Sequence, residues 1–354
     1  MGLMRTLASL AFTVLVLLAQ GCSHGKTALD VDPGVKEAHF KSLKQLTFEG
    51  THAEAYFSPD GKQLIFQGRT KGCDQMYVMN VDGSDRTLVS VEGGRNTCGY
   101  FIDANRILYS STHSAGEECP KERDRSKGYV WEIFKSYDIY TAAPDGSDLK
   151  ALTREEGYDA ESTVCGGKIT FASARAGNGV HIYTMNSDGS DVRQLTKGTG
   201  YFGGPFWSND CKRITYRAYI PAKKDVASFK KAIKEAYIPP GNLEVWAMNA
   251  NGSQKKQLTA LNTASFAPSF FHNGKKIIFS SSYTKDSKTP GRAFHLYAVN
   301  SRTPLQADAE AITHEGSFNG FPMFSPDGKY LVFASNRNSA NPHELQIFLA
   351  EWKD

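Results

Sequence analysis

Short apolar runs alternate with turn-forming residues over most of this chain. Runs such as LIF at 64–66, ITF at 169–171 and YLVF at 330–333 are rich in aromatic and β-branched residues, and Asp-Gly sequences separate such runs. Aromatic and β-branched residues favour strands, and Asp-Gly suits the tight turns of antiparallel hairpins. The pattern predicts an all-β fold for residues 44–354.

Two phrases recur along the chain and define the repeating unit. The sequence AYFSPDGKQLIFQ at 55–67 returns as PMFSPDGKYLVFA at 322–334. The second phrase is YVMNVDGSD at 77–85, and related forms stand at 140–148, 183–191 and 246–254. Each unit gives strand, Pro-Asp-Gly turn, strand, variable loop, strand, Asp-Gly-Ser turn and strand. Four antiparallel strands repeated in this way are typical of a propeller blade.

The repeats can be laid end to end as six blades, each with a large residue before its first turn. These anchors are Phe57, Phe101, Val164, Trp207, Phe270 and Phe324. The last copy stops after its third strand, LQIFLAEW at 345–352, whereas KQLTFEG at 44–50 resembles a fourth strand such as KALT at 150–153. We therefore predict a six-bladed β-propeller of four-stranded antiparallel blades, in which an N-terminal strand completes the last blade and removes exposed edges.

Two insertions, at 114–136 and 219–242, lengthen loops between second and third strands. Within the second insertion, residues 225–241 predict a helix that begins at Asp225 and ends before the Pro-Pro pair at 239–240. One face of this helix is apolar, and three lysines lie away from it; the apolar residues are Val226, Phe229, Ile233 and Tyr237. The helix either packs over the propeller with solvated lysines or docks a partner or an anionic surface.

The N-terminal residues differ from the repeats. MGLMRT carries one arginine, LASLAFTVLVLLA is apolar but short for a membrane span, and LAQGC follows. This pattern predicts a bacterial lipoprotein signal peptide at 1–21, a lipidated Cys22 and a tether at 22–43. Ser23 after the cysteine indicates the outer membrane, so we expect a periplasmic protein anchored there. The alternative is an ordinary secretory signal with an incidental cysteine.

Composition narrows the function classes. The 354 residues include 41 basic and 37 acidic ones, for a formal net charge of +4, and 40% are hydrophobic. This near balance of basic and acidic residues does not suggest a nucleic-acid partner. The repeats span 44–354, which predicts one large domain.

Five cysteines follow Cys22, and export permits disulfides between them. Cys73, Cys98 and Cys119 fall on the same predicted face of the first two blades, so we expect one bridge among them, with the pairing open. Cys165 and Cys211 lie near first turns, on the opposite face. None of these spacings matches a zinc site.

The repeat FSPDGK…LIF…QMYVMNVDGSD resembles the PD40, or WD40-like, repeat of TolB-type propellers. The resemblance implies a periplasmic binding propeller. TolB carries an additional α/β domain, which this sequence lacks, and binds the lipoprotein Pal; a Tol-Pal role for this chain stays open. The repeat is also similar to prolyl-oligopeptidase propellers, but the G-x-S-x-G spacing of their hydrolase domain occurs only as GCSHG at 21–25, before the repeats. It resembles oligogalacturonate-lyase propellers too, although no spacing singles out their histidine-lined metal site.

In a propeller the first strand of each blade lines the central channel. Five positions before the anchors stand His52, Asn96, Asp159, Phe202, Ser265 and Asn319, and three positions before them stand Glu54, Cys98, Glu161, Gly204, Ala267 and Phe321. Since strand residues two apart share a face, His52 with Glu54 and Asp159 with Glu161 predict an acidic half-ring at the channel mouth. The candidate site residues are His52, Glu54, Asn96, Asp159, Glu161, Tyr201, Phe202 and Asn319.

A polar channel mouth of this kind could bind a cationic group, a metal ion or the basic end of a peptide. The alternative is that each polar side chain bonds to a neighbouring blade. We predict a monomeric, non-enzymatic binding propeller for an envelope protein, peptide or glycan, without a cofactor. The competing hypothesis is an enzyme at the channel mouth, a metal-assisted lyase or hydrolase.

Overall fold

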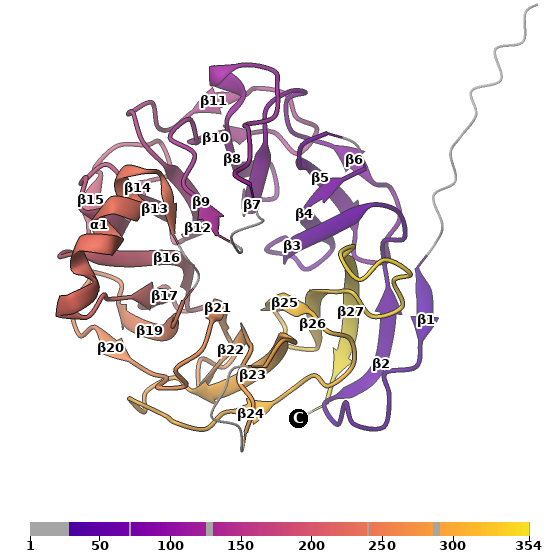
Figure 1. Cartoon of the computed structure of the whole chain (residues 1–354). Coiled ribbons are helices and arrows are strands. Elements are labelled where there is room, and N and C mark those ends of the chain that lie inside the picture. The colour runs from indigo at the N-terminus through magenta and orange to yellow at the C-terminus, as the bar shows by residue number, and fades with distance from the viewer. Residues whose placement is uncertain (1–27, 71, 125–129, 239–240, 286–290, 354) are drawn as a thin grey trace, which may run out of the picture.

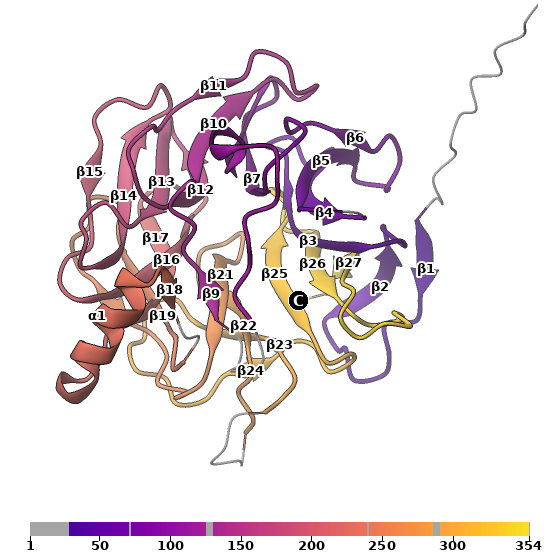
Figure 2. The same cartoon turned by 45° about the horizontal axis from the view of Figure 1, so that its top comes forward.

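The computed structural model describes residues 28–70, 72–124, 130–238, 241–285 and 291–353. They form an all-β propeller of antiparallel sheets arranged around a common centre (Figures 1 and 2). The predicted signal peptide and Cys22 lie outside the described residues. The described residues contain no helix long and apolar enough to cross a membrane.

The first sheet shows how the recurring phrases fold. Its strands are β3 (Thr51–Phe57), β4 (Gln63–Arg69), β5 (Gln75–Asn80) and β6 (Thr87–Leu88), paired antiparallel in that order. In the turn after β3, the Asp60 carboxylate accepts hydrogen bonds from the Ser58 hydroxyl, at 2.7 Å, and from the Lys62 amide, at 3.1 Å. Asp82 accepts from the Ser84 amide in the turn after β5. The predicted turn chemistry is therefore confirmed.

Four further sets of strands repeat this order. They are β7 (Asn96–Asp103), β8 (Arg106–Ser111), β10 (Asp138–Ala142) and β11 (Lys150–Ala151); β12 (Asp159–Cys165), β13 (Lys168–Ser173), β14 (Gly179–Asn186) and β15 (Arg193–Gln194); β16 (Gly200–Trp207), β17 (Arg213–Tyr219), β19 (Glu244–Asn249) and β20 (Lys256–Gln257); and β21 (Ser265–Phe270), β22 (Lys276–Ser281), β23 (His295–Asn300) and β24 (Glu310–Ala311). The second and third of these sets belong to one eight-stranded sheet, because β14 and β16 form a short parallel pair at Gly179↔Gly200 and Val180↔Tyr201.

The last sheet contains both ends of the described chain. β25 (Asn319–Phe324), β26 (Tyr330–Ser335) and β27 (Gln346–Trp352) are followed in the sheet by β2 (Phe40–Gln45) and β1 (Leu29–Val31) (Figure 1). β2 pairs antiparallel with β27. The N-terminal strand thus lies a few residues before the predicted 44–50. Phe40 and Leu43 are both buried in this sheet's core, and the register of β2 against β27 shifts between Phe40 and Ser42.

The hydrophobic core lies between neighbouring sheets. One buried cluster joins Phe57 and Phe66 of the first sheet to Val332 and Ile347 of the last. Another joins the first sheet to β7, β8 and β10 through residues such as Ile65 and Tyr109. Because each sheet buries both faces against its neighbours, the inner strands are held facing the centre.

The two insertions meet over one side of the propeller. Helix α1 (Val226–Lys234) follows the 3₁₀ turn Lys223–Asp225, and β18 (Tyr237–Ile238) then pairs antiparallel with β9 (Trp131–Glu132) of the other insertion. A second 3₁₀ turn spans His113–Ala115. The helix ends earlier than predicted, because Ala236 has a positive φ of 60° and the chain turns there into β18.

The apolar face of α1 packs against the propeller, as the periodicity predicted, but the helix is shorter than predicted. Phe229 is buried against Tyr219, with ring centroids 5.9 Å apart, and Ile233 joins the same cluster. Tyr237 belongs to β18 rather than to the helix. Lys230, Lys231 and Lys234 are exposed.

Candidate functional site

A bulge interrupts every strand that lies nearest the centre. In β3, for example, the pairing with β4 shifts between Ala53 and Tyr56, and Glu54 takes a positive φ of 53°. The same shift occurs in β7, β12, β16, β21 and β25. Within these bulges, the residues with positive φ are Glu54, Cys98, Glu161, Gly204, Ala267 and Phe321, and all six line one central cavity. A bulge re-aims a side chain, and here it turns these positions toward the centre.

The bulge also overturns the predicted pairing of site residues. His52 and Asp159 lie two positions before Glu54 and Glu161, but the shift in register breaks the alternation of faces between them. His52 and Asp159 are each 1% exposed, and neither lines the cavity. The predicted acidic half-ring of four residues is therefore wrong. Of the four predicted residues, Glu54 and Glu161 line the cavity.

His52 joins neighbouring elements instead. Its Nδ1 lies 3.3 Å from the Gln346 side-chain oxygen of β27, and its Nε2 lies 3.4 Å from a nitrogen of Arg86. Burial, reinforced by the positive charge of Arg86, lowers the pKa of His52 to about 4. This histidine is therefore neutral at physiological pH and serves the contact between the first and last sheets.

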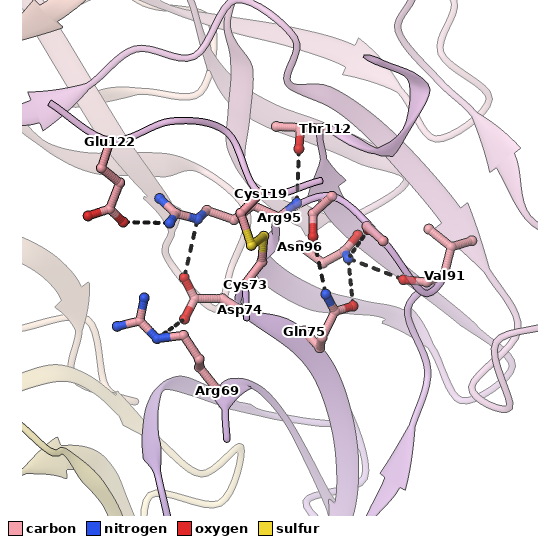
Figure 3. The surroundings of a disulfide bond; sticks show 12 residues. Arg69, Cys73, Asp74, Gln75, Val91, Arg95, Asn96, Thr112, Cys119 and Glu122 are labelled. Atoms are coloured by element: carbon pink, nitrogen blue, oxygen red, sulfur yellow. Dashed lines mark hydrogen bonds and ion pairs between the residues drawn. A yellow bond between two sulfur atoms is a disulfide. The ribbon is translucent and has the colours of Figure 1, made fainter. Parts of the chain in front are cut away.

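The other polar residues at the same repeat position also bond inside the fold. Asp159 accepts a 2.6 Å bond from Arg175, and Asn319 accepts a 2.9 Å bond from Arg337. Asn96 donates to the Gln75 side chain at 2.8 Å (Figure 3). Phe202, the remaining candidate at this position, is buried against His181, with ring centroids 5.4 Å apart. None of these four candidate residues lines the cavity. Their placement supports the alternative hypothesis, in which the polar side chains at this position form hydrogen bonds within the fold and do not contact a ligand.

The cavity has a volume of about 610 Å³, which is within the usual range for small-ligand pockets. Glu54, Glu161 and Tyr201 are the candidate residues that line it. Trp131 of β9 and the neighbouring Phe134 line it as well. The first insertion therefore contributes a wall to the cavity, in addition to the inner strands.

Glu161 is held by a cation that the sequence analysis missed. Its carboxylate forms an ion pair with Arg217 of β17 and accepts the Gly204 amide at 2.9 Å. The guanidinium also donates to the Tyr201 hydroxyl at 2.5 Å and lies 4.6 Å from the Trp131 ring centroid. A side chain at Gly204 would collide with this guanidinium. A charged residue inside the apolar strand RITYRAY was the available signal for Arg217.

A second arginine at the cavity is also paired. Arg95 lies 3.5 Å from an oxygen of Asp74 and 2.5 Å from an oxygen of Glu122, and its guanidinium lies 5.4 Å from the Phe134 ring centroid (Figure 3). The carboxylate partners and hydrogen bonding raise the pKa of Arg95 despite its burial. Arg69 lies 3.7 Å from Asp74 on the other side. This network fixes the first insertion to the first sheet.

Glu54 differs from Glu161 in its environment. Among the described residues, no basic side chain lies within ion-pair distance of it, and the Cys98 thiol is its hydrogen-bonding neighbour. Burial, together with the negative charges of Glu161 and Asp74, raises the pKa of Glu54 from 4.5 to about 7. Burial and the negative charges of Glu54 and Glu161 raise the pKa of the Cys98 thiol. Glu54 therefore changes charge near neutral pH.

The opposite side of the cavity is aromatic. Phe266 lies with its ring centroid 5.4 Å from that of Phe294, 6.2 Å from Phe318 and 5.8 Å from Phe321. Trp131 reaches this cluster, with its ring centroid 6.0 Å from that of Phe266. The cavity thus has an acidic side from β3 and β12 and an aromatic side from β21 and β25.

Two disulfides join cysteines of the described residues. Cys73 pairs with Cys119, which resolves the open pairing among the three candidates, and Cys98 remains a free thiol at the cavity. Cys165 pairs with Cys211, a bridge that the sequence analysis did not predict. The first bridge lies beside the Arg95 network and ties the first insertion to the loop before β5 (Figure 3).

Within the described ranges, no group of three His, Cys, Asp or Glu side chains is placed to hold a metal ion.

The site and fold place this chain among β-propeller proteins. A putative TolB from Agrobacterium tumefaciens is similar in structure, with a TM-score of 0.54, 17% identity, and coverage of 86% of this chain and 91% of that one. A gluconolactonase from Xanthomonas campestris gives a TM-score of 0.56 at 10% identity, covering 93% of this chain and 98% of the other. An oligogalacturonate lyase in complex with manganese gives 0.50 at 14%, covering 93% and 98%. At these identities the likeness shows the fold alone.

No family model matches the chain, and no curated protein matches it in sequence.

The titration of Glu54 predicts a pH-dependent effect on stability. Between pH 4.5 and about 7 the folded protein retains a proton that the unfolded chain has lost, so the free energy of unfolding falls as pH rises through this window. Glu54→Gln removes this dependence. We expect the variant to gain about 2 kcal/mol relative to wild type between pH 5 and pH 8, measured by urea unfolding.

Glu156→Gln is the matched control, because Glu156 is exposed and does not line the cavity. It should show no comparable pH-dependent gain. Parallel stability curves for wild type and Glu54→Gln across this pH range would contradict the raised pKa.

Proposed function

We propose that this protein is a non-enzymatic binding propeller whose ligand site is the central cavity. The observation that supports this function is a central cavity of about 610 Å³ that combines carboxylates with a cluster of aromatic rings. Enclosed, largely apolar pockets with a few oriented polar groups are the usual form of ligand sites. The ligand we propose is an envelope protein, a peptide or a glycan.

We further propose that the architecture is a six-bladed ring. The eight-stranded sheet counts as two blades. Its halves, β12–β15 and β16, β17, β19 and β20, join through only two residue pairs between β14 and β16. On this count β2 is the fourth strand of the last blade, next to β27. Pairing β2 with β27 would close the ring and give the backbone N–H and C=O groups along the edge of β27 hydrogen-bond partners. It would also bring the bulged inner strands around one cavity.

The proposed location is the periplasmic side of an outer membrane, with Cys22 as the lipid attachment site. The apolar stretch before Cys22 supports this proposal. The tether between the lipid and the fold would be shorter than the sequence suggested, because Leu29–Val31 and Phe40–Gln45 are already strands of the last sheet. Labelling with a radioactive fatty acid, abolished in Cys22→Ala, tests the anchor.

Site-specific photocrosslinking in cells tests the binding function. p-Benzoylphenylalanine would replace Phe318, which lines the cavity, or Tyr330, which is 38% exposed at the start of β26 beside the Pro-Asp-Gly turn. Each exchange puts an aromatic group in place of an aromatic one. We expect a discrete adduct from position 318 and not from position 330, and its mass would distinguish protein, peptide and glycan.

The binding proposal fails if position 318 yields no adduct, or if both positions yield the same one. An enzyme at this cavity is the competing function, and the one observation that favours it is Glu54. A carboxyl with a pKa of about 7 is suited to general acid–base chemistry. In that case a glycan or lactone substrate would be turned over by wild type and not by Glu54→Gln.

A further inference from the structure

The charges around the cavity are distributed unevenly. Of the cations that line it, Arg217 is paired with Glu161, and Arg95 is paired with Asp74 and Glu122. Glu132 adds a further carboxylate to the lining. Among the described lining residues, the carboxylates Glu54, Asp74, Glu132 and Glu161 outnumber the guanidiniums of Arg95 and Arg217. The described lining therefore carries a net negative charge.

Glu54 is the carboxylate best placed to receive a ligand's cation. It lines the cavity on the bulge of β3, and no described basic side chain lies within ion-pair distance of it. The charged groups that act on it are Glu161, Arg217 and Asp74, and the thiol of Cys98 is its hydrogen-bonding neighbour. A buried carboxylate without a cationic partner is costly, and an incoming cation would offset that cost.

The aromatic side limits the kind of cation. Phe266, Phe294, Phe318 and Phe321 present ring faces and edges without hydrogen-bonding groups. Such a surface stabilises an apolar or aromatic group and does not satisfy the hydration shell of a metal ion. An anionic ligand would meet Glu54 without a free counter-charge, because Arg217 is already engaged by Glu161 and Tyr201.

We propose that the cavity recognises a peptide segment in which a lysine or arginine side chain stands next to an aromatic or large apolar side chain. The cationic head would lie against Glu54, and the apolar group would pack on the Phe266 cluster. Arg217 would act as a positioning residue, since it holds Glu161 and Tyr201 and stacks on Trp131. This assignment rests on the proposed binding function and names the chemistry of its ligand.

Three capped dipeptides test the assignment on the purified full chain by isothermal titration calorimetry. Acetylated and amidated Phe-Lys, Phe-norleucine and Phe-Glu share the aromatic ring and differ in charge. We expect Phe-Lys to bind at least about tenfold more tightly than Phe-norleucine, because a hydrogen bond between the ammonium group and the Glu54 carboxylate contributes that much binding free energy. Phe-Glu should bind most weakly. Glu54→Gln should abolish the preference for lysine, whereas Glu156→Gln should keep it.

A second variant addresses the aromatic side. Phe318→Ala should weaken Phe-Lys and Phe-norleucine by a similar factor, because it removes packing and leaves the carboxylate in place. Melting curves of each variant would establish that it is folded before binding is compared.

The outcomes separate this assignment from the binding function itself. Equal binding of all three dipeptides, tighter binding of Phe-Glu, or no binding of any of them would overturn the recognition of a cation beside an apolar group. Loss of the lysine preference in Glu156→Gln as well would also overturn it. A crosslinked adduct at position 318 whose contact segment lacks a basic residue would do the same, while the binding function would stand.

Discussion

Replacing Cys73 and Cys119 together by serine is expected to lower the free energy of unfolding by about 2–4 kcal/mol and to weaken ligand binding at the cavity. The disulfide closes a long loop, with a sequence separation of 46, so its removal restores entropy to the unfolded chain. It also anchors the first insertion, whose residues Trp131 and Phe134 line the cavity.

The second disulfide supplies a matched control. Cys165 and Cys211 have the same sequence separation of 46, so chain entropy predicts a similar loss of stability. Neither residue lines the cavity. We therefore expect both double variants to unfold at lower urea concentration, whereas only the variant lacking Cys73 and Cys119 should bind Phe-Lys more weakly. Equal weakening of binding in the two variants would contradict a role for the first bridge in shaping the site.

Glu37→Ala is expected to cost about 3–5 kcal/mol, the loss typical when one partner of a buried ion pair is removed. Glu37 precedes β2, and its side chain is completely buried. It accepts a 3.0 Å bond from Arg337 and 3.1 Å bonds from the His314 amide. The variant would leave the Arg337 guanidinium buried over Phe333 without its carboxylate.

Chemical unfolding compared with a surface ion pair tests this cost. Glu351 of β27 forms a 3.4 Å pair with Lys41 of β2, and the two side chains are 41% and 54% exposed. Glu351→Ala should therefore cost less than about 1 kcal/mol. If Glu37→Ala cost as little as Glu351→Ala, the buried pair would not be what fastens the N-terminal segment to the last sheet.

The candidate site could be predicted in part. Aligning the repeats identified Glu54 and Glu161 as equivalent positions near the centre, and the structure places both at the cavity. The same alignment misplaced His52 and Asp159, since alternation along a strand assumes an unbroken register. No local sequence pattern predicts the bulge, because residues as different as Glu54, Gly204 and Phe321 occupy its position of positive φ.

Other parts of the site depend on contacts between distant segments. Arg217 reaches Glu161 from 56 residues away, and Trp131 stacks on it from a separate insertion. The choice of Cys119 over Cys98 as the partner of Cys73 depends on how the first insertion folds back on the first sheet. Sequence placed these three cysteines on one face, which left the pairing undetermined.

The sequence by itself determined the strands within the repeats, the two kinds of turn and their order, because these follow from the conformational preferences of neighbouring residues. It also determined that the repeats build a propeller, since no single unit can bury both of its faces. Only the tertiary structure decided which side chains enter the cavity. That choice depends on hydrogen-bond register between strands and on charge pairs between segments far apart in the chain, and neither is encoded in any short stretch of sequence.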